Sequence, residues 1–96
     1  MTTNRTLSLE RLYYLGDYRN VKFGDTITEI PEEVSNKPKA MQIMRYLQLL
    51  DTEFAFTRYL ALREKTHALS TEDTLAFLEE ERVQTFTDLL DSLQGE

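Results

Sequence analysis

The sequence predicts an α+β domain in which an N-terminal β-hairpin packs on two antiparallel helices, a ββαα layout. Three observations predict it: apolar and polar residues alternate over residues 6–30, two prolines follow this stretch, and the rest of the chain carries apolar residues at helical spacing. The chain has 96 residues, which is the usual size of one domain. We therefore expect a single domain over residues 1–96.

A hairpin is predicted over residues 6–30 because the apolar residues fall on odd positions, which share one face of a strand. These positions are Leu7, Leu9, Tyr13, Leu15, Val21, Phe23 and Ile27. Residues 16–20 contain Gly, Asp and Asn, which favour a turn. The register that pairs the apolar residues best sets Tyr13 opposite Phe23 and Arg11 opposite Asp25. Gly24, inside the second strand, predicts a bulge.

The two helices are predicted from the absence of breaking residues. Pro31 and Pro38 bracket residues 31–37, which we expect to be a connector because proline cannot donate to a ladder and restricts the residue before it. Residues 38–64 then contain neither Gly nor Pro after Pro38 and predict one long helix. A short polar link precedes the second helix, predicted over residues 70–93.

The second helix carries a capping signal and an apolar stripe. Ser70 with Asp73 matches the pattern in which a Ser side chain bonds the third helical amide. Arg82 falls within the stripe, so we expect its methylenes to pack while its guanidinium reaches water or an acid such as Asp51 or Glu53. A bidentate contact of Arg82 with an external anion is the functional alternative.

Composition restricts the classes of function. Lys and Arg number 11 against 17 Asp and Glu, a net charge of −6, which disfavours a protein built mainly to neutralise phosphates. The absence of Cys excludes disulfides, thiolate zinc sites and cysteine nucleophiles, and permits a reducing compartment. No apolar run has the length of a signal peptide or a membrane span. We therefore expect a cytoplasmic protein without a membrane partner.

The sequence predicts no enzyme, no cofactor and no metal site. His67 is the only histidine and has no nucleophile pattern near it, and the three glycines form no phosphate-binding loop. Residues 79–81 are consecutive glutamates, which diverge by about 100° each on a helix and so do not converge on a metal. A solvated acidic face and a binding face for a basic partner both remain open for the second helix.

The first helix predicts self-association because its apolar residues spread around most of its circumference. Leu49, Phe56 and Tyr59 lie opposite the seam that contains Ile43 and Leu47. Such an uncovered patch usually marks an interface, and symmetric dimers are the commonest solution. We expect a small acidic intracellular interaction module, a homodimer or larger, that acts as a regulator or accessory factor on an unidentified macromolecular partner.

The alternative function is nucleic-acid binding through the hairpin tip. Tyr14, Tyr18, Arg19 and Lys22 lie on the even face or at the tip, where aromatic rings and cations could stack on bases and contact phosphates. Glu10 dilutes this charge, and Tyr14 beside Lys22 is also common surface packing.

Overall fold

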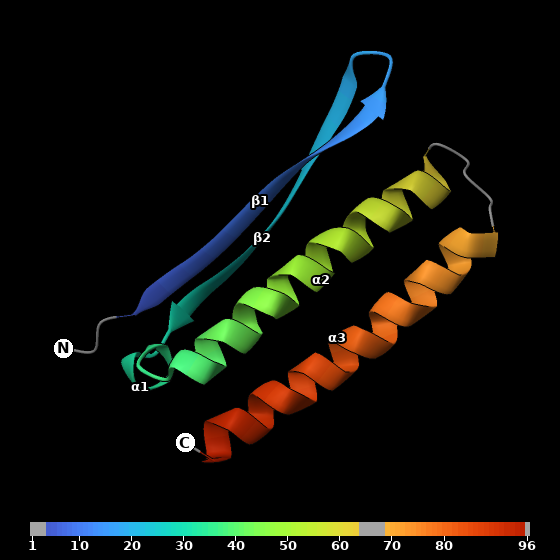
Figure 1. Ribbon diagram of the computed structural model, residues 1–96. Helices are drawn as coiled ribbons and strands as arrows, with labels where there is room; N and C mark the ends of the chain where they lie inside the picture. The colour runs from blue at the N-terminus through green and yellow to red at the C-terminus, as the bar shows by residue number, and fades with distance from the viewer. Residues whose placement is uncertain (1–3, 64–68, 96) are drawn as a thin grey trace.

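The computed structural model describes residues 4–63 and 69–95 and shows the predicted ββαα layout (Figure 1). The elements in chain order are β1 (Arg5–Gly16), β2 (Arg19–Ile30), α1 (Glu32–Ser35), α2 (Pro38–Leu62) and α3 (Leu69–Gly95). β1 and β2 form a two-stranded antiparallel sheet.

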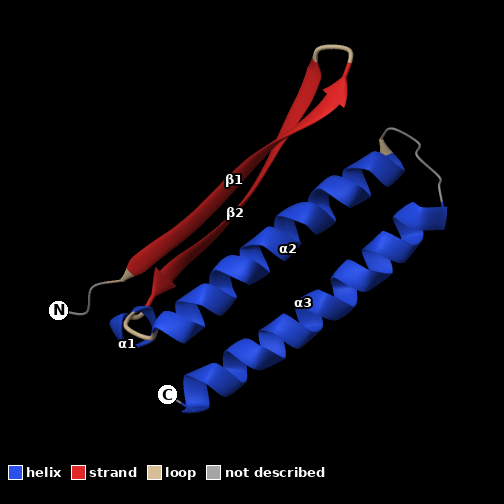
Figure 2. Ribbon diagram, in the orientation of Figure 1, coloured by secondary structure: helices blue, strands red, loops and turns tan. Residues whose placement is uncertain are grey.

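The molecule is flat, because the hairpin, α2 and α3 lie side by side. The hairpin packs mainly on α2, and α3 packs on the other side of the same helix (Figure 2). The extents are 49 × 26 × 15 Å, and the smallest is little more than the diameter of one helix with its side chains. The radius of gyration is 15.9 Å, whereas a compact domain of this length has a radius of about 12.5 Å.

A two-residue turn joins the strands, where the sequence predicted a longer loop over residues 16–20. Asp17 and Tyr18 adopt positive φ angles of 50° and 62°, and Gly16 before them has a φ of 85°. Positive φ at both central residues gives the turn a twist that matches the twist of paired strands. Asp tolerates this conformation, and Gly16 adopts it without steric cost.

The tight turn changes the register by two residues, so the predicted pairing is wrong. Arg11 lies opposite Phe23, and Asp25 lies opposite Leu9, so no ion pair joins Arg11 and Asp25. A shift of two residues keeps every side chain on its predicted face, because side chains alternate with a period of two. The odd positions therefore still face α2, with Leu7 buried.

The predicted bulge at Gly24 is also wrong. The register is irregular between Arg5 and Leu7 and again between Tyr14 and Gly16, whereas Gly24 pairs regularly with Glu10. A Cβ atom at Gly24 would lie 2.8 Å from the carbonyl oxygen of Leu9. The glycine therefore permits a close approach of the two strands.

The helices keep close to their predicted bounds. The connector is partly helical, since the amide of Ser35 donates to the carbonyl of Pro31 at 2.9 Å and closes the single turn of α1. α2 begins at Pro38 as predicted and ends at Leu62. α3 already includes Leu69, so the predicted cap Ser70 lies inside the helix. The side chain of Ser70 and the link that contains His67 lie outside the described part of the chain.

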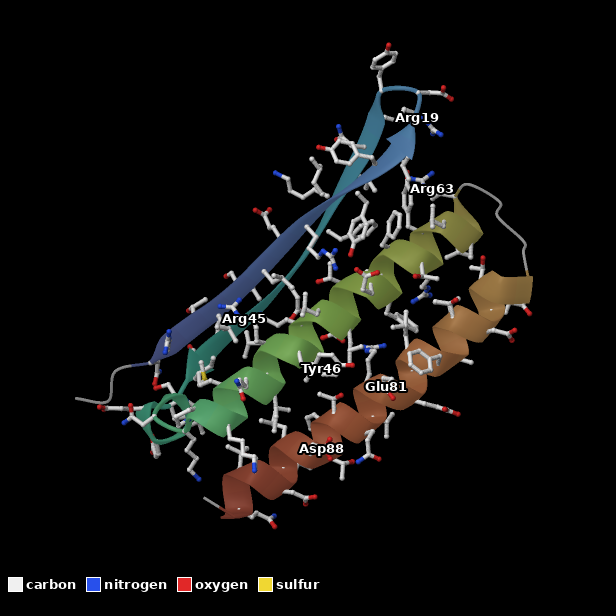
Figure 3. All side chains as sticks on the ribbon, viewed as in Figure 1. Arg19, Arg45, Tyr46, Arg63, Glu81 and Asp88 are labelled. Carbon is white, nitrogen blue, oxygen red and sulfur yellow. The ribbon has the colours of Figure 1, made fainter. Side chains whose placement is uncertain are left out.

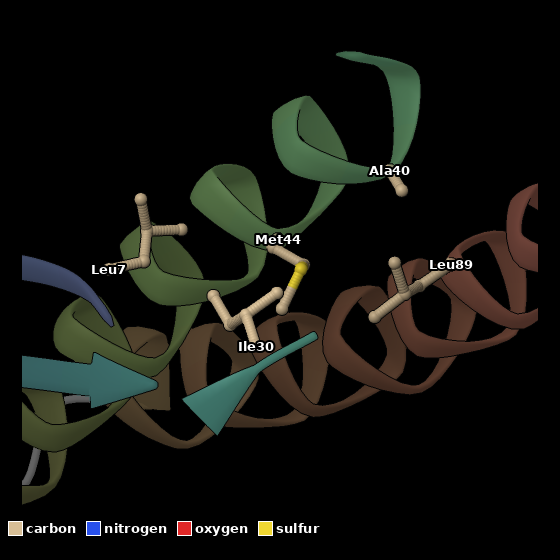
Figure 4. Packing of buried hydrophobic residues seen from close by; sticks show 5 residues of the cluster. All are labelled: Leu7, Ile30, Ala40, Met44 and Leu89. Atoms are coloured by element: carbon tan, nitrogen blue, oxygen red, sulfur yellow. The ribbon is translucent and has the colours of Figure 1, made fainter. Parts of the chain in front are cut away.

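The buried core gathers at the end of the molecule where β2 leads into the helices. It consists of Leu7, Ile30, Ala40, Met44 and Leu89, one cluster drawn from all three long elements (Figure 4). The ammonium group of Lys37 donates to the carbonyl oxygen of Leu93 at 2.8 Å and fastens the connector to α3 at the same end.

A buried glutamine ties the hairpin to α2. Gln48 is fully buried, and its Nε2 atom donates to the carbonyl oxygens of Leu7 at 2.7 Å and Asp25 at 3.2 Å. A buried amide without partners would cost a few kcal/mol. Gln48 therefore selects the relative placement of both strands on the helix.

Candidate protein interaction surface

An aromatic cluster occupies the contact between the hairpin and the second half of α2. The rings of Tyr13 and Phe56 are stacked with centroids 3.9 Å apart, and Phe23 meets Tyr59 edge-on at 5.7 Å. Phe56 and Tyr59, predicted to mediate self-association together with Leu49, thus have partners within their own chain. Leu49 is half-buried on α2. Self-association through these three residues stays a prediction, and the hairpin already explains the apolar character of two of them.

Glu53 links the hairpin to α2 beside this cluster. It accepts a hydrogen bond of 2.7 Å from the hydroxyl of Tyr13 and forms an ion pair with Arg11. Burial and the negative charge of Glu53, which also accepts the phenol's hydrogen bond, raise the pKa of Tyr13 to about 12. The acid that pairs with Arg11 is therefore on the helix, where the sequence predicted Asp25 of the neighbouring strand.

Arg82 joins α3 to α2, as the sequence predicted. Its Nε atom donates to a carboxylate oxygen of Asp51 at 2.7 Å, and a terminal nitrogen donates to Glu79 at 3.2 Å. The guanidinium carbon also lies 4.5 Å from the ring centroid of Phe54. Of the two acids proposed as partners, the structure selects Asp51. These contacts within the chain account for the arginine in the stripe.

The groove between the hairpin and the helices combines both signs of charge. It has a volume of about 730 Å³, and its lining includes Asp25, Asp51, Arg58 and Arg82. Burial, with the nearby charge of Asp51, raises the pKa of Asp25 above its usual value. Among the described residues, no three His, Cys, Asp or Glu side chains are arranged to hold a metal ion.

An apolar stripe lies exposed along α3. Val83, Phe86 and Leu90 are 61%, 52% and 45% exposed, and their spacing of three and four residues sets them on one side of the helix. We call these three residues the outer stripe. Leu93 has the same spacing, but it is half-buried and packs against the core cluster, so it does not belong to this stripe.

The side of α3 that faces α2 is more polar than the outer stripe. Leu78, Thr85 and Leu89 are buried there, together with the half-buried Arg82. The sequence predicted one broad apolar stripe that included Leu78 and Leu89 together with Val83, Phe86 and Leu90. A rotation of about 100° separates the two sets, since each residue of the outer stripe follows a residue of the inner one. This offset in the sequence could have indicated that α3 carries two separate faces, one that packs on α2 and one that stays exposed.

Acidic side chains occupy the remaining side of α3. Figure 3 shows Glu81 opposite Tyr46 of α2, and the tyrosine hydroxyl lies 3.4 Å from the carboxylate of Glu81. Asp88 accepts a hydrogen bond of 3.0 Å from Gln84 of the same helix. Glu81 and Asp88 therefore lie on a different side of α3 from the outer stripe, whereas Glu79 lies next to Val83 and Phe86.

The structure brings the four predicted tip residues to one end of the hairpin. Tyr18 is fully exposed at the turn beside Arg19, and Tyr14 is 78% exposed on the face turned away from α2. Lys22 lies on that same outer face, opposite Leu12. Figure 3 shows that Arg63, at the end of α2, lies at the same end of the molecule as Arg19.

The chain matches no protein-family model, no curated protein and no solved structure. None of the helices in the described ranges has both the length and the apolar character required to cross a bilayer. The function is therefore argued from the surface of the molecule.

Proposed function

We propose that the protein is a small acidic protein–protein interaction module of the cytoplasm that self-associates and acts as a regulator or accessory factor without catalysis. The observation that carries this proposal is the size of the surface. The chain exposes 6926 Å², whereas a compact monomer of 11.3 kDa exposes about 5,700 Å². About 1,200 Å² per chain is therefore in excess of what a compact monomer leaves in water.

The flat shape explains this excess. Domains usually bury their apolar faces between two packed layers, whereas here the hairpin, α2 and α3 form one layer. Each element therefore keeps an uncovered side, and on α3 that side includes the outer stripe. A second protein surface would supply the missing layer, and exposed apolar patches of this kind usually mark protein interfaces.

The acidic composition favours a protein partner over a nucleic acid. The net charge is −6, and this field opposes the approach of a phosphate backbone. Two of the charged residues in the large groove, Asp51 and Arg82, form an ion pair that joins α2 to α3, so this pair has a structural role. We therefore assign the chain a binding role and no reaction.

Nucleic-acid binding through the hairpin tip is the second candidate. One observation favours it: Tyr14 and Tyr18 expose their rings at the end of the hairpin where Arg19 and Lys22 also lie. Exposed aromatic rings beside cations are typical of surfaces that stack on unpaired bases.

The test of the favoured function is the mass of the full chain in solution. Sedimentation velocity and light scattering at micromolar concentration should give at least twice the monomer mass of 11.3 kDa. The variant Arg19→Glu with Lys22→Glu is the matched control, and it should keep the assembled mass because the tip is remote from the outer stripe. A mass of one chain at every concentration would contradict self-association.

A further inference from the structure

We propose that the outer stripe of α3 packs on the outer stripe of a second copy of this chain, with the two helices antiparallel and crossing at Phe86. This inference rests on the proposed self-association and specifies its surface and its geometry.

The first argument is the area to be covered. The excess surface of about 1,200 Å² per chain exceeds the roughly 800 Å² that each partner loses in an interface of standard size. The excess is therefore large enough to supply an interface of standard size with a second copy. A symmetric interface uses the same patch on both copies, so the outer stripe supplies both halves of the contact.

The second argument is the spacing of the stripe. Val83, Phe86 and Leu90 follow one another at intervals of three and four residues. This is the spacing at which helices pack side chains of one into gaps of the other along a shared seam. The flanking positions on the outer side, Thr87 and Gln94, carry no charge. A second copy therefore meets no repulsion there, and a basic partner would find no acid at these two positions.

The third argument is charge, which decides the direction of the two helices. Extending the stripe toward the N-terminus of α3 leads to Glu79 and Ala76 at the next seam positions. A parallel pair would set Glu79 directly against the same residue of the second copy. Arg82 of its own chain pairs with Glu79 but is shared with Asp51, so the two acids keep a net negative charge, and like charges in a seam are destabilising. An antiparallel pair centred on Phe86 carries each Glu79 toward the end of the partner helix instead.

The antiparallel arrangement makes specific contacts. With the crossing at Phe86, the position directly opposite Val83 is residue 89 of the partner, so the partner's Leu90 lies one residue further, about 1.5 Å along the axis. The symmetry repeats this contact between Val83 and Leu90 on the other side of Phe86. Two copies of Val83 would be displaced from one another by about 9 Å along the helices, at 1.5 Å per residue. The N-terminal half of each α3, with its hairpin tip, then projects from opposite ends of the dimer.

The first experiment compares two phenylalanines on opposite sides of α3. Phe86→Glu inserts a charge into the proposed seam and should raise the dissociation constant of the dimer by about 100-fold or more. Phe77→Glu is the matched control, since Phe77 is 59% exposed and lies nine positions earlier, half a turn away from Phe86 in direction. Sedimentation equilibrium gives the constants, and circular dichroism checks that each variant folds. Val83→Asn provides a second, milder variant of the seam.

The second experiment tests direction with disulfides, because the chain contains no Cys. A disulfide requires Cα atoms within about 7 Å of each other. An antiparallel pair therefore predicts that Val83→Cys and Leu90→Cys cross-link when the two variants are mixed and oxidised, and that neither cross-links with itself. A parallel pair predicts the reverse pattern. Non-reducing electrophoresis with mass spectrometry separates the mixed product from the two symmetric ones.

The outcomes separate this inference from the proposed function. A wild-type chain that is monomeric at every concentration contradicts self-association itself. If the wild type is dimeric and the folded variants Phe86→Glu and Val83→Asn keep its dissociation constant, the outer stripe is not the interface, although self-association stands. Self-cross-linking of Val83→Cys would overturn the antiparallel direction.

Discussion

Tyr13 of β1 and Phe56 of α2 lie face to face, with ring centroids 3.9 Å apart and ring planes inclined by 12°. Phe23 of β2 meets both rings edge-on, at centroid distances of 6.3 Å and 6.2 Å. Such aromatic pairs contribute about 0.5–1.5 kcal/mol beyond the burial of their area. The cluster lies away from the buried core at the other end of α2, so it holds the far half of the hairpin on the helix.

Replacing Phe56 should therefore reduce stability. Phe56→Ala is expected to lower the free energy of unfolding by about 2–3 kcal/mol. This loss is smaller than for a fully buried ring, because the Phe56 ring is only partly buried. Urea denaturation measures this loss at equal protein concentration. Phe77→Ala, at an exposed position, should change the value by less than about 0.5 kcal/mol. A Phe56→Ala chain of unchanged stability that no longer self-associates would return this residue to an interface role.

Tyr13 should titrate later than an ordinary phenol. Its pKa is raised to about 12 by burial and by Glu53, so phenolate absorbance should show a late step that Tyr13→Phe deletes and Tyr18→Phe retains. Glu53→Gln should move this step toward lower pH. The stability gained from the raised pKa is present below pH 10, the ordinary phenol value, and is lost as the pH rises to about 12. A titration of Tyr13 at pH 10 would contradict the contact with Glu53.

Asp25→Asn should stabilise the protein at neutral pH. The pKa of Asp25 is raised by burial and by the nearby charge of Asp51, so its ionised form is disfavoured in the folded state. The stability that a group with a raised pKa contributes is fully present below its pKa in the unfolded state, and it is lost as the pH rises through its pKa in the folded state. The melting temperature of Asp25→Asn should thus exceed that of the wild type at pH 7 and equal it at pH 3. A lower melting temperature at pH 7 would show that Asp25 has a stabilising cationic partner.

The hairpin tip should fail to bind nucleic acid if the protein is an acidic interaction module. Fluorescence anisotropy with single-stranded and duplex oligonucleotides should show no binding at about 50 mM salt, where phosphate contacts are strongest. The variant Arg19→Glu with Lys22→Glu should give the same result as the wild type. Micromolar binding that weakens with salt and disappears in this variant would favour the second candidate function.

The local pattern of the sequence determined the elements of this protein and the faces of its strands. Alternation placed Leu7 and the other odd residues toward α2, because a strand has a period of two whatever its register. Pro38 marked the start of α2 because its ring suits the first turn of a helix. The sequence offered water, Asp51 or Glu53 as the partner of the Arg82 guanidinium, and the structure shows the pair with Asp51.

Only the tertiary structure decided the register and which apolar faces stay exposed. The register depends on the positive φ angles of Asp17 and Tyr18, and the sequence around them was also compatible with a longer turn. Phe56 is covered because Tyr13 reaches it from the hairpin, whereas Phe86 is 52% exposed because it lies beside the contact of α3 with α2, where no described element covers it. Helical spacing shows which residues share a face, but contacts between distant segments determine which face is buried.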